Sequence, residues 1–157
     1  MSENNMSNLL ELTVLSDGTK EYRLNGLVHR DDGPAVVWAD GTIEEWFFHG
    51  HRHREDGPAI TRKDGYESWW KNGKIHRDDG GPSITDKNGN QFWHFEGALH
   101  RDGLPAIIMT NGYLEWWDHG LFIKSNSYQF DEKNIVSDTF DNESSFEEDL
   151  VANQFSP

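Results

Sequence analysis

Histidine, arginine and aspartate recur together in this sequence at a spacing that suits acid–base chemistry. The pattern His-Arg-x-Asp-Gly begins at His29, His53 and His76, and a version one residue shorter begins at His100. A histidine oriented by a carboxylate is half of a general acid–base pair. A catalytic centre is normally single, however, whereas this pattern recurs in one register with no nucleophile recurring beside it. We therefore predict a non-enzymatic chain without catalytic residues, in which these histidines are structural and satisfy turn backbone or join neighbouring copies.

A second histidine cluster suggests metal binding. His49, His51 and His53 alternate with other residues, and His51 and His53 would share one face of a strand. A zinc site needs three or four convergent ligands. His49, however, occupies a turn position and His53 belongs to the recurring motif, which leaves His51 alone without a structural explanation. We predict no metal site and no cofactor.

The motif is part of a longer period of 23 to 24 residues. Each copy combines an Asp-Gly or Asn-Gly pair, an aromatic residue, a second turn three residues later, the histidine motif and a proline. The opening pairs begin at Asp17, Asp40, Asp64, Asn88 and Asn111, and the second turns begin at Asn25, His49, Asn72, Glu96 and His119. The prolines are Pro34, Pro58, Pro82 and Pro105. We number these copies as units one to five, each opening at its first pair; the fifth is truncated.

The turn residues predict the fold. Asn-Gly and Asp-Gly supply positive φ angles at the two central positions of a hairpin turn. The segments between turns are short and rich in aromatic and β-branched residues, as strands require. The sequence therefore predicts an all-β protein of tandem β-hairpins, about ten strands forming an extended antiparallel meander. We divide the chain into an N-terminal capping segment (1–16) with a strand over 9–15, the array (17–124) and an acidic C-terminal tail (125–157).

Two columns of side chains recur in every full unit. The residue three before the second turn is always aromatic, and the residue two after the proline is always aliphatic: Tyr22, Trp46, Trp69, Trp93 and Trp116, and Val36, Ile60, Ile84 and Ile107. This constancy predicts that the two columns pack together as the core. The next column varies, and three of its members, Phe47, Trp70 and Trp117, form a candidate exposed aromatic stripe. Such a stripe is either a partner surface or a face that the tail covers.

The segment from Trp70 to His76, Trp-Lys-Asn-Gly-Lys-Ile-His, resembles a MORN-type repeat, a β-hairpin unit of about 23 residues. The Gly-x-x-His element recurs at Gly26, Gly50, Gly73 and Gly97, but arginine follows the histidine in every copy, and an Asp-Gly-Pro type segment is added. This variant resembles repeat proteins of bacteriophages and giant viruses. The resemblance covers about 108 of the 157 residues. It implies a binding module for protein partners; MORN arrays sometimes bind lipid headgroups, which the acidic charge argues against here.

Composition excludes several classes of protein. The net charge of −14 gives a field of the wrong sign for gripping nucleic acid or an anionic membrane, although aromatic side chains can stack on bases. The chain has no cysteine, and no apolar run is long enough to cross a bilayer. Residues 1–8 lack the apolar core of a signal peptide. We therefore expect a cytoplasmic protein, in the host cell if the chain is viral.

These observations favour a protein-binding repeat module, phage- or virus-encoded, that acts on a host protein. Phe47, Trp70 and Trp117 would anchor the partner, and the acidic charge favours a basic one. One alternative is an acidic inhibitor that mimics nucleic acid on a host defence or transcription protein. Another is a structural or virion-associated protein that self-assembles as a homo-oligomer through its sheet edge. In the tail, Ser145 and Glu148 predict a short helix over 145–154, which either caps the array or docks on a target.

Overall fold

The computed structural model describes residues 9–126, and this part of the chain is all β, with no helix. The described residues therefore contain no helix that could cross a membrane. The strands, most of them two or three residues long, are β1 Leu10–Val14, β2 Lys20–Leu24, β3 Leu27–Val28, β4 Val36–Val37, β5 Ile43–Glu45, β6 Phe47–Phe48, β7 His51–Arg52, β8 Ile60–Arg62, β9 Glu67–Ser68, β10 Trp70–Lys71, β11 Lys74–Ile75, β12 Ile84–Thr85, β13 Gln91–Phe92, β14 His94–Phe95, β15 Ala98–Leu99, β16 Ile107–Ile108, β17 Leu114–Asp118 and β18 Leu121–Asn126.

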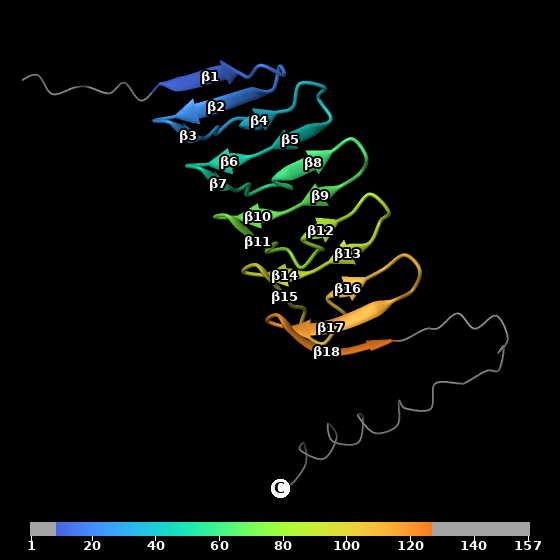
Figure 1. Cartoon of the computed structure of the whole chain (residues 1–157). Coiled ribbons are helices and arrows are strands. Elements are labelled where there is room, and N and C mark those ends of the chain that lie inside the picture. The colour runs from blue at the N-terminus through green and yellow to red at the C-terminus, as the bar shows by residue number, and fades with distance from the viewer. Residues whose placement is uncertain (1–8, 127–157) are drawn as a thin grey trace, which may run out of the picture.

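The strands form one extended antiparallel sheet. Twelve of them follow the order β1-β2-β4-β5-β8-β9-β12-β13-β16-β17-β18, with β3 beside β2, and three two-stranded ribbons (β6–β7, β10–β11, β14–β15) continue the hairpins. Figure 1 shows the strands succeeding one another along a single twisted stack from the blue end to the orange end. The predicted all-β meander is confirmed. The strand count differs for two reasons. The residues after each second turn form a further strand, namely β3, β7, β11, β15 and β18, and pairing is interrupted at the aromatic residue of the middle units, so that β5 and β6, for example, flank Trp46.

The two classes of turn differ in backbone conformation. At the second turns, both central residues have positive φ, with the non-glycine residues between 45° and 52°. This is the left-handed geometry that a two-residue hairpin needs. At the opening pairs only the glycine has positive φ, so the expectation of two positive angles is wrong there. Instead a side-chain oxygen caps the turn, as when Asp40 accepts from the Thr42 N–H at 2.9 Å.

The predicted core is wrong, because the two recurring columns point to opposite faces of the sheet. Ile60 is the Cα partner of Glu45 and of Ser68, the residues directly before the two aromatic positions. Neighbours along a strand face opposite sides, so Ile60 lies across the sheet from Trp46. A one-residue offset in pairing is enough to exchange the faces.

The small residue after each proline is the neighbour of the aromatic column instead. Ala35, Ala59, Ser83 and Ala106 are 0–1% exposed. Their carbonyl groups accept hydrogen bonds of 2.7–2.8 Å from the backbone N–H of Tyr22, Trp46, Trp69 and Trp93. A small side chain here lets the backbone approach the ring of the preceding strand. Among the described residues the buried hydrophobic core is correspondingly thin: Ala35, Ala59, Ile60, Trp93, Ala106 and Ile107.

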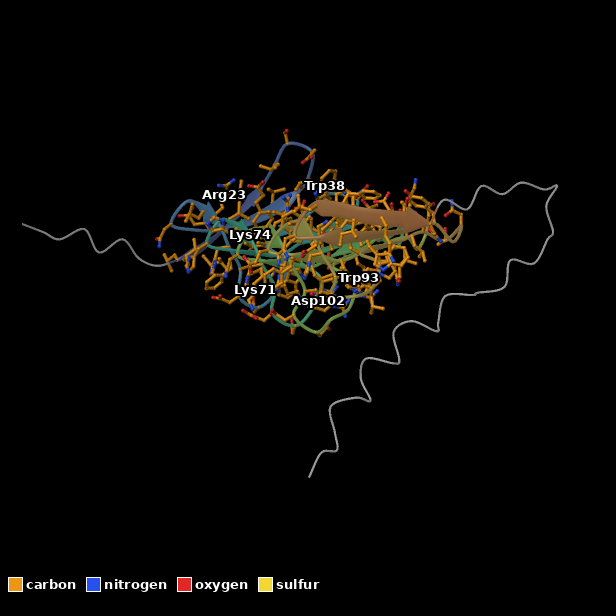
Figure 2. The ribbon with its side chains drawn as sticks, turned by 90° about the horizontal axis from the view of Figure 1, so that it is seen from below. Arg23, Trp38, Lys71, Lys74, Trp93 and Asp102 are labelled. Atoms are coloured by element: carbon orange, nitrogen blue, oxygen red, sulfur yellow. The ribbon has the colours of Figure 1, made fainter. Side chains whose placement is uncertain are left out.

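The sheet therefore has two unlike faces. We call the side carrying the aromatic column and the His-Arg loops the loop face, and the side carrying Trp38, Glu45 and Phe47 the open face. Viewed along the stack, Figure 2 shows Trp38 on one side of the sheet and Trp93 on the other, with Asp102 of the last loop on the Trp93 side. The first strand, predicted over 9–15, is present as β1 and pairs with β2 along its whole length.

Candidate binding surface on the loop face

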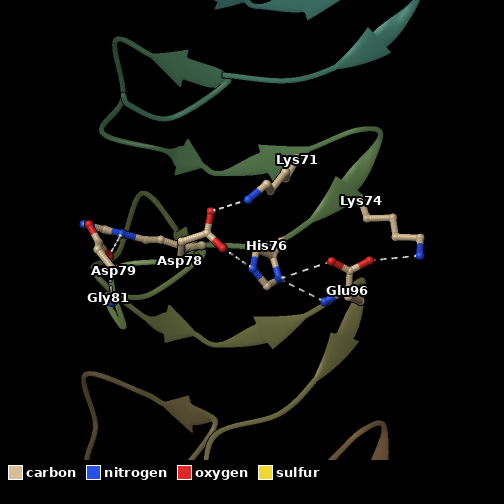
Figure 3. Close-up of polar contacts among 8 residues, drawn as sticks. Lys71, Lys74, His76, Asp78, Asp79, Gly81 and Glu96 are labelled. Carbon is tan, nitrogen blue, oxygen red and sulfur yellow. Dashed lines mark hydrogen bonds and ion pairs between the residues drawn. The ribbon is translucent and has the colours of Figure 1, made fainter. Parts of the chain in front are cut away.

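Each motif histidine links its own unit to the next unit by a hydrogen bond. The Nδ1 atom accepts a hydrogen bond from the backbone N–H at the first central residue of the following hairpin turn. The pairs are His29 with His49, His53 with Asn72, His76 with Glu96 and His100 with His119, at 3.1 to 3.3 Å. Because Nδ1 accepts, the ring proton is assigned to Nε2. Nε2 in turn lies 2.8–3.3 Å from a carboxylate two residues later, as Figure 3 shows for His76 and Asp78.

Each motif arginine closes the loop over the aromatic column. The guanidinium carbon lies 3.9–4.2 Å from the ring centroids of Tyr22, Trp46, Trp69 and Trp93. Nη1 donates to the carbonyl oxygen of the motif proline at 3.1–3.4 Å. In the first three units Nε also donates to the aspartate two residues later, at 2.6–2.9 Å. The arginine thus combines stacking, loop closure and an ion pair.

The carboxyl groups of Asp32, Asp56 and Asp78 in these loops have lowered pKa values. The Arg54 hydrogen bond holds the pKa of Asp56 below its ordinary value, and Arg30 does the same for Asp32. The pKa of Asp78 is lowered by its hydrogen bonds with Lys71 first and His76 second. All of these carboxylates stay ionised at neutral pH. In the first three units the motif histidine, arginine and second aspartate thus all make contacts that hold the loop.

Grooves separate successive loops on this face. The largest, with a volume of about 750 Å³, lies between the loops of units one and two. Its lining includes aromatic, arginine and acidic residues, among them Trp46, Phe48, Arg30, Arg54, Asp31 and Glu55. A smaller groove of about 350 Å³ lies between the loops of units three and four, over Phe95.

One unit position decides whether a groove is open. The residue directly before the second turn is Phe48 in unit two, Lys71 in unit three and Phe95 in unit four. Phe48 and Phe95 are 43% and 47% exposed, and their rings lie against motif histidines. Lys71 instead reaches Asp78 at 2.7 Å, and the groove around it has a volume of only about 80 Å³. None of the predicted site residues lies at this position directly before the second turn. The aromatic residue at this position in two of the units could have indicated a binding surface.

The predicted stripe is half-buried. Phe47 and Trp70 lie on either side of Arg52, whose guanidinium carbon is 5.2 Å from the first ring centroid and 5.4 Å from the second. Trp117 is separate from them: its ring contacts Phe122 edge-on at 5.3 Å, and His94 occupies the intervening unit. The structure thus brings two of the three residues together, around an arginine. The predicted tail helix lies outside the described residues.

The histidine run considered for metal binding does not converge. His49 stacks on His29 at a centroid distance of 4.5 Å, and His53 holds the turn of the next unit. Within residues 9–126, the group of histidines and acidic residues whose ligand atoms lie within 4.8 Å of one another is His100, Asp118 and His119. Comparisons with protein-family models and with curated proteins find no match to this chain.

Proposed function

We propose that this chain is a non-enzymatic protein-binding module that holds a basic segment of its partner in the groove between the loops of units one and two. The observation that carries the proposal is Phe48, a large apolar side chain exposed at the floor of a groove with an acidic rim. Exposed apolar surface rimmed by charge is typical of partner sites. An aromatic anchor within a charged rim is also the usual composition of a binding hot spot.

The charges of the rim favour a cationic partner. Asp31 and Glu55 are 77% and 73% exposed, and each faces the Nε2 atom of a histidine whose Nδ1 carries no proton. Their negative charge is therefore not cancelled within the loop. The two arginines of the groove, by contrast, are already paired with Asp32 and Asp56. A lysine or arginine beside an apolar residue would match this surface and be steered towards it by the net negative charge.

The motif supports the same function. We propose that the sheet is a MORN-like array of the variant resembling phage and giant-virus repeats, and that the partner is a host protein in the host cytoplasm. MORN arrays are mostly binding modules. The open face, with Phe47 and Trp70, would then be a second and smaller contact area.

A random peptide display library tests the proposal directly, without knowledge of the natural partner. Peptides enriched on the wild-type chain should contain lysine or arginine next to an aromatic or aliphatic residue. A synthetic peptide from the enriched set should bind the Phe48→Ala variant at least about tenfold more weakly. Trp38→Ala is the matched control for the groove, because Trp38 is 46% exposed but lies on the open face, outside the groove lining; a loss of affinity there would report binding at the open face instead.

Two outcomes would overturn the proposal. One is the absence of any enrichment, and the other is a peptide that loses affinity with Trp38→Ala and not with Phe48→Ala. Salt separates the remaining alternative, because binding that collapses at high ionic strength favours nucleic-acid mimicry over an anchored interface. Affinity purification from the source cell would then identify the natural partner.

Self-assembly is a second candidate, favoured by the two edge strands. β1 and β18 end the strand order, so each pairs on one side only within the described chain. Leu121, Phe122 and Ile123 of β18 are 72%, 54% and 58% exposed. A long apolar edge is a template for pairing with another chain. If this occurs, light scattering should rise with concentration for the wild type and not for Ile123→Lys.

A further inference from the structure

His100, Asp118 and His119 bring three metal-ligating side chains together at the last hairpin. His100 follows strand β15, Asp118 ends β17 and His119 begins the turn into β18. Asp118 Oδ1 lies 3.1 Å from His100 Nδ1 and 2.5 Å from His119 Nδ1. The two imidazole centroids are 3.9 Å apart. Neighbouring ligand atoms of a tetrahedral zinc ion lie about 3.3 Å apart, so these positions suit one ion after a small adjustment.

The ring of His100 is already oriented as a metal ligand. Its side chain is 13% exposed, and Nε2 lies 3.3 Å from Asp102 Oδ1. Nδ1 accepts the backbone N–H of His119 at 3.3 Å and so carries no proton. A carboxylate behind a histidine is the usual outer arrangement of a metal-bound imidazole. A metal ion at Nδ1 would replace the long N–H contact from His119.

The contact between His100 and Asp118 needs a proton or a metal ion between its two atoms. His100 Nδ1 and Asp118 Oδ1 lie 3.1 Å apart, so two acceptors face and repel each other whenever Nδ1 carries no proton. Between units three and four, His76 Nδ1 lies 3.9 Å from Oε1 of Glu96, a carboxylate at the position that His119 has in unit five. A divalent cation between the two lone pairs would turn this repulsion into two bonds. Exposed fractions of 59% for Asp118 and 60% for His119 leave the site open to solvent.

The other units provide an internal comparison. Unit two has the same two histidines, with His29 and His49 stacked at 4.5 Å, but Phe48 stands where unit five has Asp118. Unit three has Lys71 and Asn72 at these positions, and unit four has Phe95 and Glu96. The carboxylate between two imidazoles is thus specific to the last hairpin among the described units. It is not a by-product of the recurring motif.

We propose that His100, Asp118 and His119 form a binding site for one divalent transition-metal ion of the zinc class, with solvent water in the remaining positions. Two imidazoles and one carboxylate suit Zn²⁺, Co²⁺ or Ni²⁺. The ion would join the loop of unit four to the hairpin of unit five, in place of the longest of the four histidine hydrogen bonds. Because the folded chain assembles these ligands, binding would also stabilise it. The site is independent of the proposed groove in units one and two.

The test uses the full chain, untagged and stripped of metal with a chelator. Zn²⁺ is titrated by calorimetry, and Co²⁺ is followed by its visible absorption. We expect one equivalent of metal to bind, and we expect Asp118→Asn and His119→Asn each to weaken binding at least about tenfold. His49→Asn is the matched control, because it removes the stacked histidine of unit two, and it should leave the affinity unchanged. Phe48→Asp should create a second binding equivalent by adding the missing carboxylate.

Several results would overturn the proposal. Equal losses from His49→Asn and His119→Asn would show diffuse binding by a histidine-rich chain. An unchanged affinity for Asp118→Asn would remove the carboxylate from the site. Circular dichroism checks that the variants are folded. In the wild type, Co²⁺ must broaden the imidazole NMR signals of His100 and His119 before those of His29 and His49; the reverse order would also reject the site.

Discussion

The Nδ1 atom of His76 accepts a hydrogen bond of 3.1 Å from the backbone N–H of Glu96, in the hairpin turn of the next unit. Nε2 of the same ring lies 2.8 Å from Asp78, so one side chain joins the loop of unit three to the turn of unit four (Figure 3). The same relationship at His29, His53 and His100 means that successive units are held together by polar contacts as well as by the thin apolar core. The recurring histidine therefore links each unit to the next, and this role explains why the same residue recurs in unit after unit.

Replacing His76 should destabilise the chain markedly. His76 is 8% exposed, and His76→Ala leaves the Glu96 N–H without its acceptor and opens space beside the Phe95 ring. We expect the free energy of unfolding to fall by about 1–3 kcal/mol in urea denaturation. His51→Ala is the control, since His51 is exposed in β7, and its effect should stay within about 0.5 kcal/mol. Equal stability of the two variants would contradict the structural role.

Arginine and lysine should not be interchangeable at position 54. The guanidinium of Arg54 lies 4.0 Å from the Trp46 ring centroid, and Nη1 donates to the Pro58 carbonyl oxygen. Lysine keeps the charge but has no planar group to stack. We expect Arg54→Lys to lower the free energy of unfolding by about 1 kcal/mol. Arg62→Lys, at an exposed arginine above Tyr66, should cost clearly less; a larger cost there would place the stabilisation elsewhere.

Stability should require glycine at position 57 only because the Arg54 side chain lies over it. The φ of Gly57 is not in the left-handed region, but a Cβ would lie 2.7 Å from the guanidinium carbon. Gly57→Ala should therefore cost about 1–2 kcal/mol in the wild type and close to nothing in an Arg54→Ala background, as measured by a double-mutant cycle. Unit four has Leu104 before its proline, where Gly103 turns with a φ of 66° and the loop follows another path. Additive costs would show that glycine is needed for another reason.

His94 should make stability depend on pH. Burial lowers the pKa of His94 below its ordinary 6.5, and its Nδ1 lies 2.8 Å from Ser83 Oγ. The unfolded chain thus binds more protons between the folded and unfolded pKa values, and stability rises with pH through that window. We expect stability to fall as the pH drops from about 7.5 to about 5.5, and His94→Gln to lose less over this interval. The two proteins differ only at position 94, so the difference between their pH curves isolates His94; parallel pH curves would exclude it.

Trp70 should contribute to stability as well as to any partner surface. Its indole N–H donates to Ser68 Oγ at 2.8 Å, and Ser68 is fully buried. We expect Trp70→Ala to cost about 2–3 kcal/mol, and Trp70→Phe only about 1 kcal/mol because the ring is kept. Thermal denaturation measures both. An unchanged melting temperature for Trp70→Ala would contradict this expectation and support the exposed aromatic stripe that the sequence predicts.

Local features of the chain are predictable and the contacts between strands are not. The Asn72-Gly73 pair predicts its own hairpin, because the positive φ angles are a property of those two residues. The prediction that Ile60 packs beside Trp46 is wrong, because the register between two strands depends on the path of the loop from His53 to Pro58. The stack of Arg54 on the aromatic column also went unpredicted, since the loop that carries the arginine can fold over either face of a sheet.

The all-β class, the order of the hairpins and the periodic turn positions follow from the amino-acid sequence, because local backbone preferences repeat in it at a constant spacing. Which side chains meet is settled only by the folded chain. His100 and Asp118 are far apart in sequence and converge when unit five pairs with unit four. Phe48 becomes a groove floor because two loops fold over the same face of the sheet. The physical reason is that strand alternation makes every such contact depend on a single-residue register, which is set by loop paths and not by composition.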